Sequence, residues 1–250
     1  GEECMNAHWP KHKLYHKAAK QKAQEWREGA SEHDRALAES EARLAEATGN
    51  EYDKRFADAV ALMAECDHNA AAKAWRKLIK QSSDEPGAYH NLATVLKRST
   101  RFAEAAQMYL KAMELYEDGT EDWAKASAGA FDTLKTPVCH EVPKPEWWND
   151  EGLKALSARV VALEPDEAVS CAMRARILLG GDALYKAPWN VGLRTAAEVK
   201  EAATWYRRAA IVAYTPADKW RFEQHASQID EFADPLLAEE EAEAAKVRAA

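Results

Sequence analysis

The sequence predicts an all-α protein whose helices stack in pairs as a right-handed solenoid. Charged residues make up 30% of the chain, and Ala, Glu, Lys and Leu are abundant, which is typical of helical proteins. Runs of Val, Ile and Thr with period-two alternation are nearly absent, so we expect no β-strand. Large and small residues recur at a fixed interval in the middle of the chain, which indicates repeated helix pairs.

Composition also limits the function. The net charge is −8, and residues 239–243 add an acidic stretch, so a nucleic-acid partner is disfavoured. No apolar run approaches the length of about 18 residues that a membrane span needs, and the N-terminus lacks the apolar segment of a secretory signal. The four cysteines form no framework of the secreted kind. We therefore expect a soluble intracellular protein, cytoplasmic or nuclear, without a membrane or nucleic-acid partner.

The first element, residues 1–17, contains three candidate metal ligands. Seven residues separate Cys4 from His12, and three separate His12 from His16. Together with the intervening His-Trp-Pro-x-His-Lys stretch, this spacing resembles the closing segment of a MYND-type zinc finger. The resemblance implies that the three residues are the last of eight Cys/His ligands, which bind two zinc ions in an interleaved pattern. His16 stands where the family has cysteine, and an imidazole can take that place.

The same resemblance predicts that the zinc site is incomplete. The interleaving gives Cys4 to one ion and His12 with His16 to the other, whereas a structural zinc ion needs four ligands. We therefore expect zinc in the intact finger and none retained by this chain. The alternative is an amphipathic helix in which His8, His12 and His16 share a face because they are four residues apart. Since the chain lacks an initiator Met, we expect its start to be a truncation or a gene-model boundary.

Residues 18–50 are predicted to be a helical spacer of two helices, broken at residues 29–31. Ser31 is the expected N-cap of the second helix, with Glu32 and Asp34 in its first turn. The expected apolar anchors are Trp26, Leu37 and Leu44. Because they are sparse, the segment either packs in part or is a solvated spacer.

The segment from Pro86 to Glu117 contains two helical patterns joined by a short polar turn. Its repeated large and small residues are Tyr89, Leu92, Ala93 and Leu96, then Phe102, Ala105, Tyr109 and Ala112. This arrangement resembles one tetratricopeptide repeat. Small alanines let two antiparallel helices approach closely, and the large residues fill the spaces opposite them.

The repeat length of this family, about 34 residues, gives a test of the pattern. Such a step leads back from Ala105 to Ala71 and from Tyr109 to Trp75, and forward from Tyr89 to Trp123. An upstream repeat from about Tyr52 to Glu85 follows, with Ala59 and Leu62 in its first helix. Asp58 stands where the family prefers Leu.

We assign repeats and their cap to residues 51–233 and a charged C-terminal helix to residues 234–250. The expected helices cover residues 51–66, 69–82, 87–98, 102–117, 121–134, 150–163, 167–179 and 196–213. Long loops interrupt the third and fourth pairs, and the apolar residues after Pro216 indicate a helix that caps the solenoid. Trp147, Trp148 and Trp189 lie in or beside those loops. We favour loops that fold back over the core, with presentation of aromatic anchors to a partner as the alternative.

No catalytic motif was found, and we assign no catalytic residue. The chain lacks a His-Glu-x-x-His helix, a phosphate-binding Gly-rich loop and a Gly-x-Ser-x-Gly elbow. The neighbours Cys139 and His140 are interpreted as an ordinary loop pair, since adjacent side chains usually point apart.

Two functions of different classes follow from the resemblances. The first is a non-catalytic protein–protein interaction module, an adaptor or scaffold, whose first helices line a groove for a peptide or a partner helix. The alternative is a fragment of a MYND/SET-type lysine methyltransferase that lacks its catalytic domain. That enzyme family needs an Asn-His-x-Cys segment and a Gly-rich cofactor strand, and neither is found here.

The tetratricopeptide resemblance also implies which residues face the groove. They are Phe56, Val60, His90, Asn91, Thr94, Lys97 and Arg98. Asn91 occupies the place where chaperone-tail-binding members keep an asparagine, but Phe56 and Val60 stand where those members carry Lys and Asn. We therefore expect weak binding of a mixed apolar and acidic segment and no tight binding of chaperone tails. Alternatively, Lys97 and Arg98 only stabilise the C-terminal end of their helix dipole.

Overall fold

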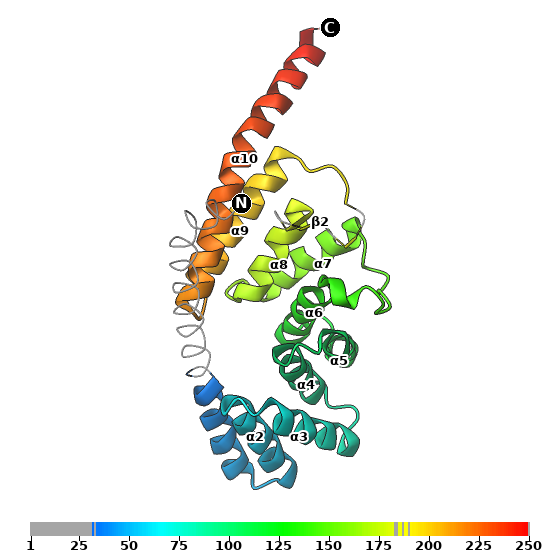
Figure 1. The fold of residues 1–250 in the computed structure, drawn as a ribbon, viewed down its shortest axis with the longest axis vertical. Helices are drawn as coiled ribbons and strands as arrows, with labels where there is room; N and C mark the ends of the chain where they lie inside the picture. The colour runs from blue at the N-terminus through cyan, green and yellow to red at the C-terminus, as the bar shows by residue number, and fades with distance from the viewer. Residues whose placement is uncertain (1–31, 33, 183–184, 187, 190, 250) are drawn as a thin grey trace, which may run out of the picture.

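The computed structural model describes residues 32, 34–182, 185–186, 188–189 and 191–249, and this part is helical almost throughout (Figure 1). Residues 34–48 are helical. The helices that follow are α2 (Glu51–Ala64), α3 (His68–Gln81), α4 (Pro86–Arg98), α5 (Phe102–Leu115), α6 (Glu121–Leu134), α7 (Asp150–Leu163), α8 (Ala168–Leu179), α9 (Ala196–Ile211) and α10 (Pro216–Ala249), with a short 3-10 helix η1 (Pro137–Cys139) after α6. The all-α prediction is confirmed, and the expected ends of α2 to α9 differ from these by two residues or fewer.

Two backbone features differ from the sequence-based expectation. A pair of two-residue antiparallel strands, β1 (Gly181–Asp182) and β2 (Tyr185–Lys186), follows α8. Gly180 and Gly181, both with positive φ, turn the chain into this pair. The strands are too short to show an alternation of apolar residues in the sequence. The other difference is α10, which continues through Pro235 instead of dividing into a cap and a separate charged helix. Its contact with α9 extends past the proline, because the backbone N–H of Ala196 donates to Glu240 Oε1 at 2.9 Å.

Most helices begin at a side-chain cap. At the ends of α2 and α4, a residue other than glycine takes the left-handed conformation that commonly ends a helix. Cys66 and Thr100 take the left-handed conformation there, with φ of 61° and 62°. In the turn after α4, the N–H of Arg101 donates to the carbonyl of Leu96 at 2.9 Å. This bond closes the Schellman motif that ends the helix.

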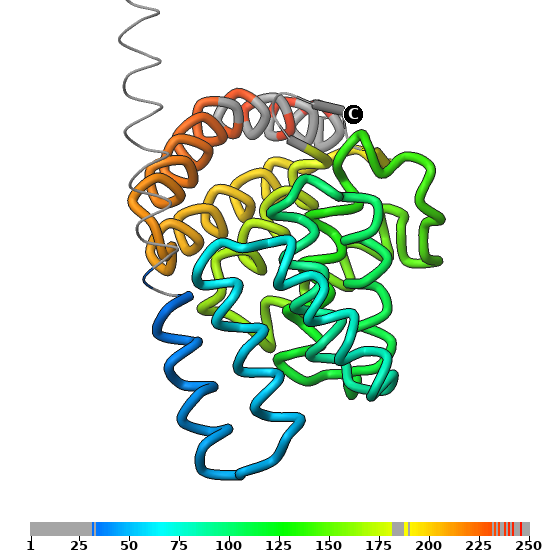
Figure 2. The backbone as a smooth tube through the Cα atoms, turned by 60° about the horizontal axis from the view of Figure 1, so that its bottom comes forward, coloured from blue at the N-terminus to red at the C-terminus, as the bar shows by residue number. Residues whose placement is uncertain are grey.

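The helices form two layers of a curved stack (Figures 1 and 2). The first-helix layer holds α2, α4, α6 and α8, and the second layer holds α3, α5, α7 and α9. Neighbouring first helices touch, since α4 contacts α6 and α6 contacts α8, while each second helix packs against the first helices beside it. At one end α10 covers α9, as the sequence predicts for a capping helix.

Burial confirms most of the predicted size pattern, whereas Tyr89 and Phe102 are only partly buried. All the residues found by the 34-residue step are buried, namely Ala71, Trp75 and Trp123, as are Ala93, Ala105, Tyr109 and Ala112 of the central repeat. A further small residue is required at Gly129 on α6. A Cβ placed there would lie 2.6 Å from the Tyr109 ring. The absence of a side chain at Gly129 therefore lets α5 and α6 approach closely around Tyr109.

Helix α2 is rotated relative to the predicted repeat register. Ala59 is buried as expected, but Leu62 is only partly buried, and Val60 and Met63 enter the core instead. Asp58 is exposed, so the apolar face turns away from it. The Trp75 indole N–H, which donates to Met63 Sδ at 3.3 Å, holds this orientation.

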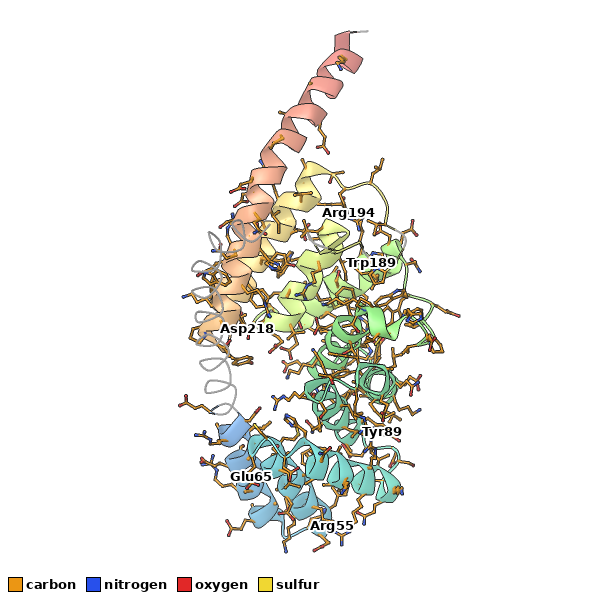
Figure 3. The ribbon with its side chains drawn as sticks, in the orientation of Figure 1. Arg55, Glu65, Tyr89, Trp189, Arg194 and Asp218 are labelled. Atoms are coloured by element: carbon orange, nitrogen blue, oxygen red, sulfur yellow. The ribbon has the colours of Figure 1, made fainter. Side chains whose placement is uncertain are left out.

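The long loops fold back over the core, as favoured from the sequence. In the first loop Cys139 and Val142 are buried against α5 and α6. In the second, Trp189 is 7% exposed, and its ring centroid lies 5.6 Å from that of Phe131. Arg194 anchors the same loop through two hydrogen bonds to the Asp150 carboxylate, at 2.8 and 2.5 Å. Figure 3 labels Trp189 and Arg194 on this loop.

Residues 34–48, called the arm below, pack thinly against the repeats. The prediction that Leu37 and Leu44 are apolar anchors is wrong, because they are 41% and 54% exposed. The arm buries Ala45 instead, and it packs Ala38 against the core around α2 and α3. The predicted break at residues 29–31, the Ser31 cap and the Trp26 anchor lie outside the described residues.

Candidate protein-binding surface

The predicted groove residues lie on α2 and α4, both in the first-helix layer. Of the two on α2, Val60 is 2% exposed and therefore offers no surface to a partner. Phe56 is half-buried, with its ring perpendicular to that of Trp75 at a centroid distance of 4.8 Å. The rotation of α2 turns these positions toward the core, so the accessible part of the predicted surface lies on α4.

His90 is partly buried and lies between two tyrosines. Its ring meets those of Tyr109 and Tyr116 edge-on, at centroid distances of 5.4 and 6.4 Å. Burial lowers the pKa of His90 to about 4, an effect that the nearby Asp122 carboxylate only partly offsets. The imidazole is therefore neutral at pH 7. Its Nδ1 atom is buried with no hydrogen-bond partner among the described residues.

Thr94 and Asn91 differ in what they contact. The Thr94 hydroxyl donates to the carbonyl of His90 at 3.2 Å and lies 3.0 Å from the Tyr109 hydroxyl. It is thus part of the packing around Tyr109. Asn91 is half-buried, and its amide makes no hydrogen bond with the described part of the chain. Asn91 is the predicted groove residue whose polar group is most available to another molecule.

Lys97 is held inside an ionic cluster that joins three first helices. Its Nζ lies 2.5 Å from Asp132 Oδ2 on α6. Asp132 Oδ1 lies 3.3 Å from Lys135, which directly follows α6, and 3.3 Å from Arg176 on α8. Burial alone would raise the pKa of Asp132, but the three cations hold it well below its usual range. Burial would likewise lower the pKa of Lys97, yet the Asp132 carboxylate outweighs it and raises that pKa. The cluster therefore stays charged at neutral pH.

Arg98, the next residue on α4, pairs with the arm instead. Its guanidinium donates two hydrogen bonds to the Asp34 carboxylate, at 2.7 and 3.0 Å. Asp34 is 8% exposed, so this fork is nearly closed to solvent. Both predicted groove cations are thus neutralised by carboxylates of the same chain.

Sequence reasoning missed Asp132, Arg176 and the pairing of Asp34. The partners are far apart in sequence, 35 residues for Lys97 with Asp132 and 64 for Arg98 with Asp34. A usable signal was present in α6, where Asp132 is a charged residue next to the buried Phe131 and Thr133. A charge at such a place must be paired, because an isolated buried charge is strongly unfavourable.

The remaining predicted sites are the zinc-ligand candidates and the Cys139–His140 pair. The zinc-ligand candidates Cys4, His12 and His16 lie outside the described residues, so that prediction stays untested. Among the residues that the structure describes, no group of three or more His, Cys, Asp or Glu could hold a metal ion. Cys139 is buried whereas His140 is exposed, in agreement with an ordinary loop pair. No described helix has the length and apolar character that crossing a membrane requires.

Comparison with known proteins identifies the fold. No family model matches the sequence, and no curated protein matches it. Among solved structures, pilF of Pseudomonas aeruginosa, a protein with tetratricopeptide repeats, is similar, with a TM-score of 0.51 and 15% sequence identity. The match covers 88% of this chain and 89% of pilF. It supports a helical-repeat solenoid of the tetratricopeptide type, and nothing in the comparisons supports a MYND-type finger.

Proposed function

We propose that this chain is a non-catalytic interaction module that binds a peptide or a partner helix on α4, in the first-helix layer. The observation that carries the proposal is the side-chain amide of Asn91, unpaired among the described residues. Its amide has no hydrogen-bond partner in the described part of the chain, while Thr94, Lys97 and Arg98 around it are all engaged. An amide in that position can both donate to and accept from the backbone of a bound segment. An intracellular location is part of the proposal, in keeping with Cys66, Cys139 and Cys171, which are free thiols.

Affinity capture from a cell lysate tests this function, provided that the variants keep the fold. Lys97→Glu is unsuitable, because it would place a second carboxylate beside Asp132 in the partly buried cluster. We therefore compare the wild-type chain with Asn91→Ala and with Gln107→Ala, a matched amide change on the exposed side of α5. The expected result is a captured protein that Asn91→Ala loses and Gln107→Ala retains. Identical captured proteins from all three would exclude Asn91 as a contact.

The proposal includes the absence of methyltransferase activity, which rests on the missing Asn-His-x-Cys segment. Incubation of the chain with a labelled methyl donor and bulk lysate tests it. Specific label transfer would favour the methyltransferase alternative instead.

We further propose that the chain retains no stoichiometric zinc. The support is the number of ligands: the resemblance divides Cys4, His12 and His16 between two zinc ions, and each ion needs four ligands. Elemental analysis of the purified chain should find well under one zinc per chain. One zinc per chain that disappears in Cys4→Ser would refute this.

A further inference from the structure

The Asp34–Arg98 pair has the geometry that arginine uses to bind a carboxylate from another molecule. Both carboxylate oxygens accept from the two terminal nitrogens of one guanidinium, at 2.7 and 3.0 Å. Such a two-pronged contact is specific for a planar carboxylate, and any Asp, Glu or C-terminal carboxylate can form it. The Asp34 carboxylate therefore occupies the place beside Arg98 of α4 that the carboxylate of an acidic ligand could fill in the same way.

The element that carries Asp34 buries little apolar surface among the described residues. The arm exposes both of its leucines, and the side chains that it packs inward are small, those of Ala38 and Ala45. Because the hydrophobic contribution scales with the apolar area buried, these alanines contribute little to holding the arm. The ion pair at Asp34 ties the N-terminal end of the described arm to α4.

The neighbouring cation on α4 cannot be exchanged in this way. The carboxylate that faces Lys97 comes from Asp132, which lies inside the rigid α4–α6–α8 packing and also contacts Lys135 and Arg176. Displacing Asp132 would break the first-helix layer, whereas displacing Asp34 only requires the arm to move. Of the two predicted groove cations, Arg98 is the one that a partner can reach.

We propose that the arm is an internal competitor for the binding surface, in which Asp34 holds Arg98 until an acidic side chain of a partner protein takes its place. This rests on the proposed function and adds its regulation, because the partner must displace the arm before it can engage Arg98. The ligand class is an acidic, partly apolar protein segment, in accordance with the positive charge that Arg98 would present once Asp34 is displaced.

The first test measures the arm without any partner. Hydrogen–deuterium exchange of residues 34–48 is compared among the wild-type chain, Asp34→Asn and Glu46→Gln, the last being a matched change at an exposed site of the arm. We expect exchange about tenfold faster across the arm in Asp34→Asn alone, with α4 to α6 unchanged. Equal protection of the arm in all three chains would overturn the proposal, whatever the capture experiment shows.

The second test measures competition with a defined probe, a fluorescein-labelled peptide of alternating Leu and Glu, compared with the same peptide carrying Gln for Glu. If the closed arm reduces the accessible fraction about tenfold, Asp34→Asn should bind the acidic peptide about tenfold more tightly than the wild-type chain, because apparent affinity scales with that fraction. The gain should vanish in the double variant Asp34→Asn, Arg98→Gln and for the Gln peptide.

Two results of the peptide experiment would overturn the proposal. One is faster exchange of the arm without tighter peptide binding. The other is a gain that persists after Arg98→Gln. Failure of the proposed function is recognised separately, since it appears as capture that does not depend on Asn91 while the exchange of the arm still responds to Asp34.

Discussion

The central repeat and the arm both place a carboxylate against α4, but the two carboxylates are supported differently. Asp132 projects from a helix that is buried nearly throughout and meets three cations. Asp34 projects from a helix that buries little more than alanine, and among the described residues it forms an ion pair with Arg98 alone. The Asp132 ion pairs stabilise the packing of α4, α6 and α8. The Asp34 ion pair holds the thinly packed arm against α4, and we propose that a partner's carboxylate can replace Asp34 there.

The largest effect that would separate the two regions is the loss of Asp132. Asp132→Ala removes the carboxylate that faces three cations in a partly buried place, so we expect a loss of about 2–3 kcal/mol, below the about 3–5 kcal/mol of a fully buried pair. Asp34→Ala should cost only about 1 kcal/mol, because Arg98 can return to solvent when the arm moves. Urea unfolding of both variants measures this, and equal losses would contradict the comparison.

Acid should destabilise the central repeat through His90. The pKa of His90 is lowered to about 4 in the folded chain, whereas it is about 6.5 in the unfolded chain. Between these two pH values the unfolded chain binds a proton at His90 and the folded chain does not. The stability that depends on the neutral imidazole is complete above pH 6.5 and is lost as the pH falls toward 4, by about 3 kcal/mol. Unfolding free energies at several pH values should show this slope in the wild-type chain and a smaller one in His90→Gln. The exposed-site control His140→Gln should keep the wild-type slope, and a slope unchanged by His90→Gln would refute the assignment.

Close packing in the central repeat should make it sensitive to a single methyl group. Gly129→Ala puts a Cβ 2.6 Å from the rigid Tyr109 ring, and such overpacking costs about 1–3 kcal/mol. Gly87→Ala is the matched control, since a Cβ there meets its nearest neighbour, the flexible Glu85 side chain, at 3.4 Å. Thermal unfolding should show a lower midpoint for the first variant only. Equal midpoints would mean that α5 and α6 are less closely packed than described.

The smallest expected change is a gain at the turn after α4. Thr100 holds φ of 62°, a conformation that disfavours a β-branched residue, so Thr100→Gly should stabilise the chain by about 1 kcal/mol. Cys66→Gly at the end of α2, with φ of 61°, should act in the same direction. Chemical denaturation of both variants is the measurement. A loss of stability in both would indicate that these turns do not limit the fold.

Much of the fold could be predicted because its signals are local or periodic. Helix ends follow from caps and proline positions, and the step of about 34 residues locates Trp75 and Trp123 because each repeat reuses one packing solution. The candidate site was less predictable. Asn91 followed from its place in the repeat, and its role as a contact stays a prediction. Val60 failed as a surface residue because α2 is rotated so that Val60 and Met63 enter the core, with Met63 against Trp75.

By itself, the sequence determined that the chain is an α-helical repeat protein, how its helices divide, and which alanines and aromatic residues fill its core. Only the tertiary structure decided which carboxylates face Lys97 and Arg98, that α10 passes through Pro235, and that a short strand pair follows α8. The physical reason is one of range. Capping and amphipathic periodicity act within a few residues, but an ion pair across 35 or 64 residues depends on how the helices stack and rotate.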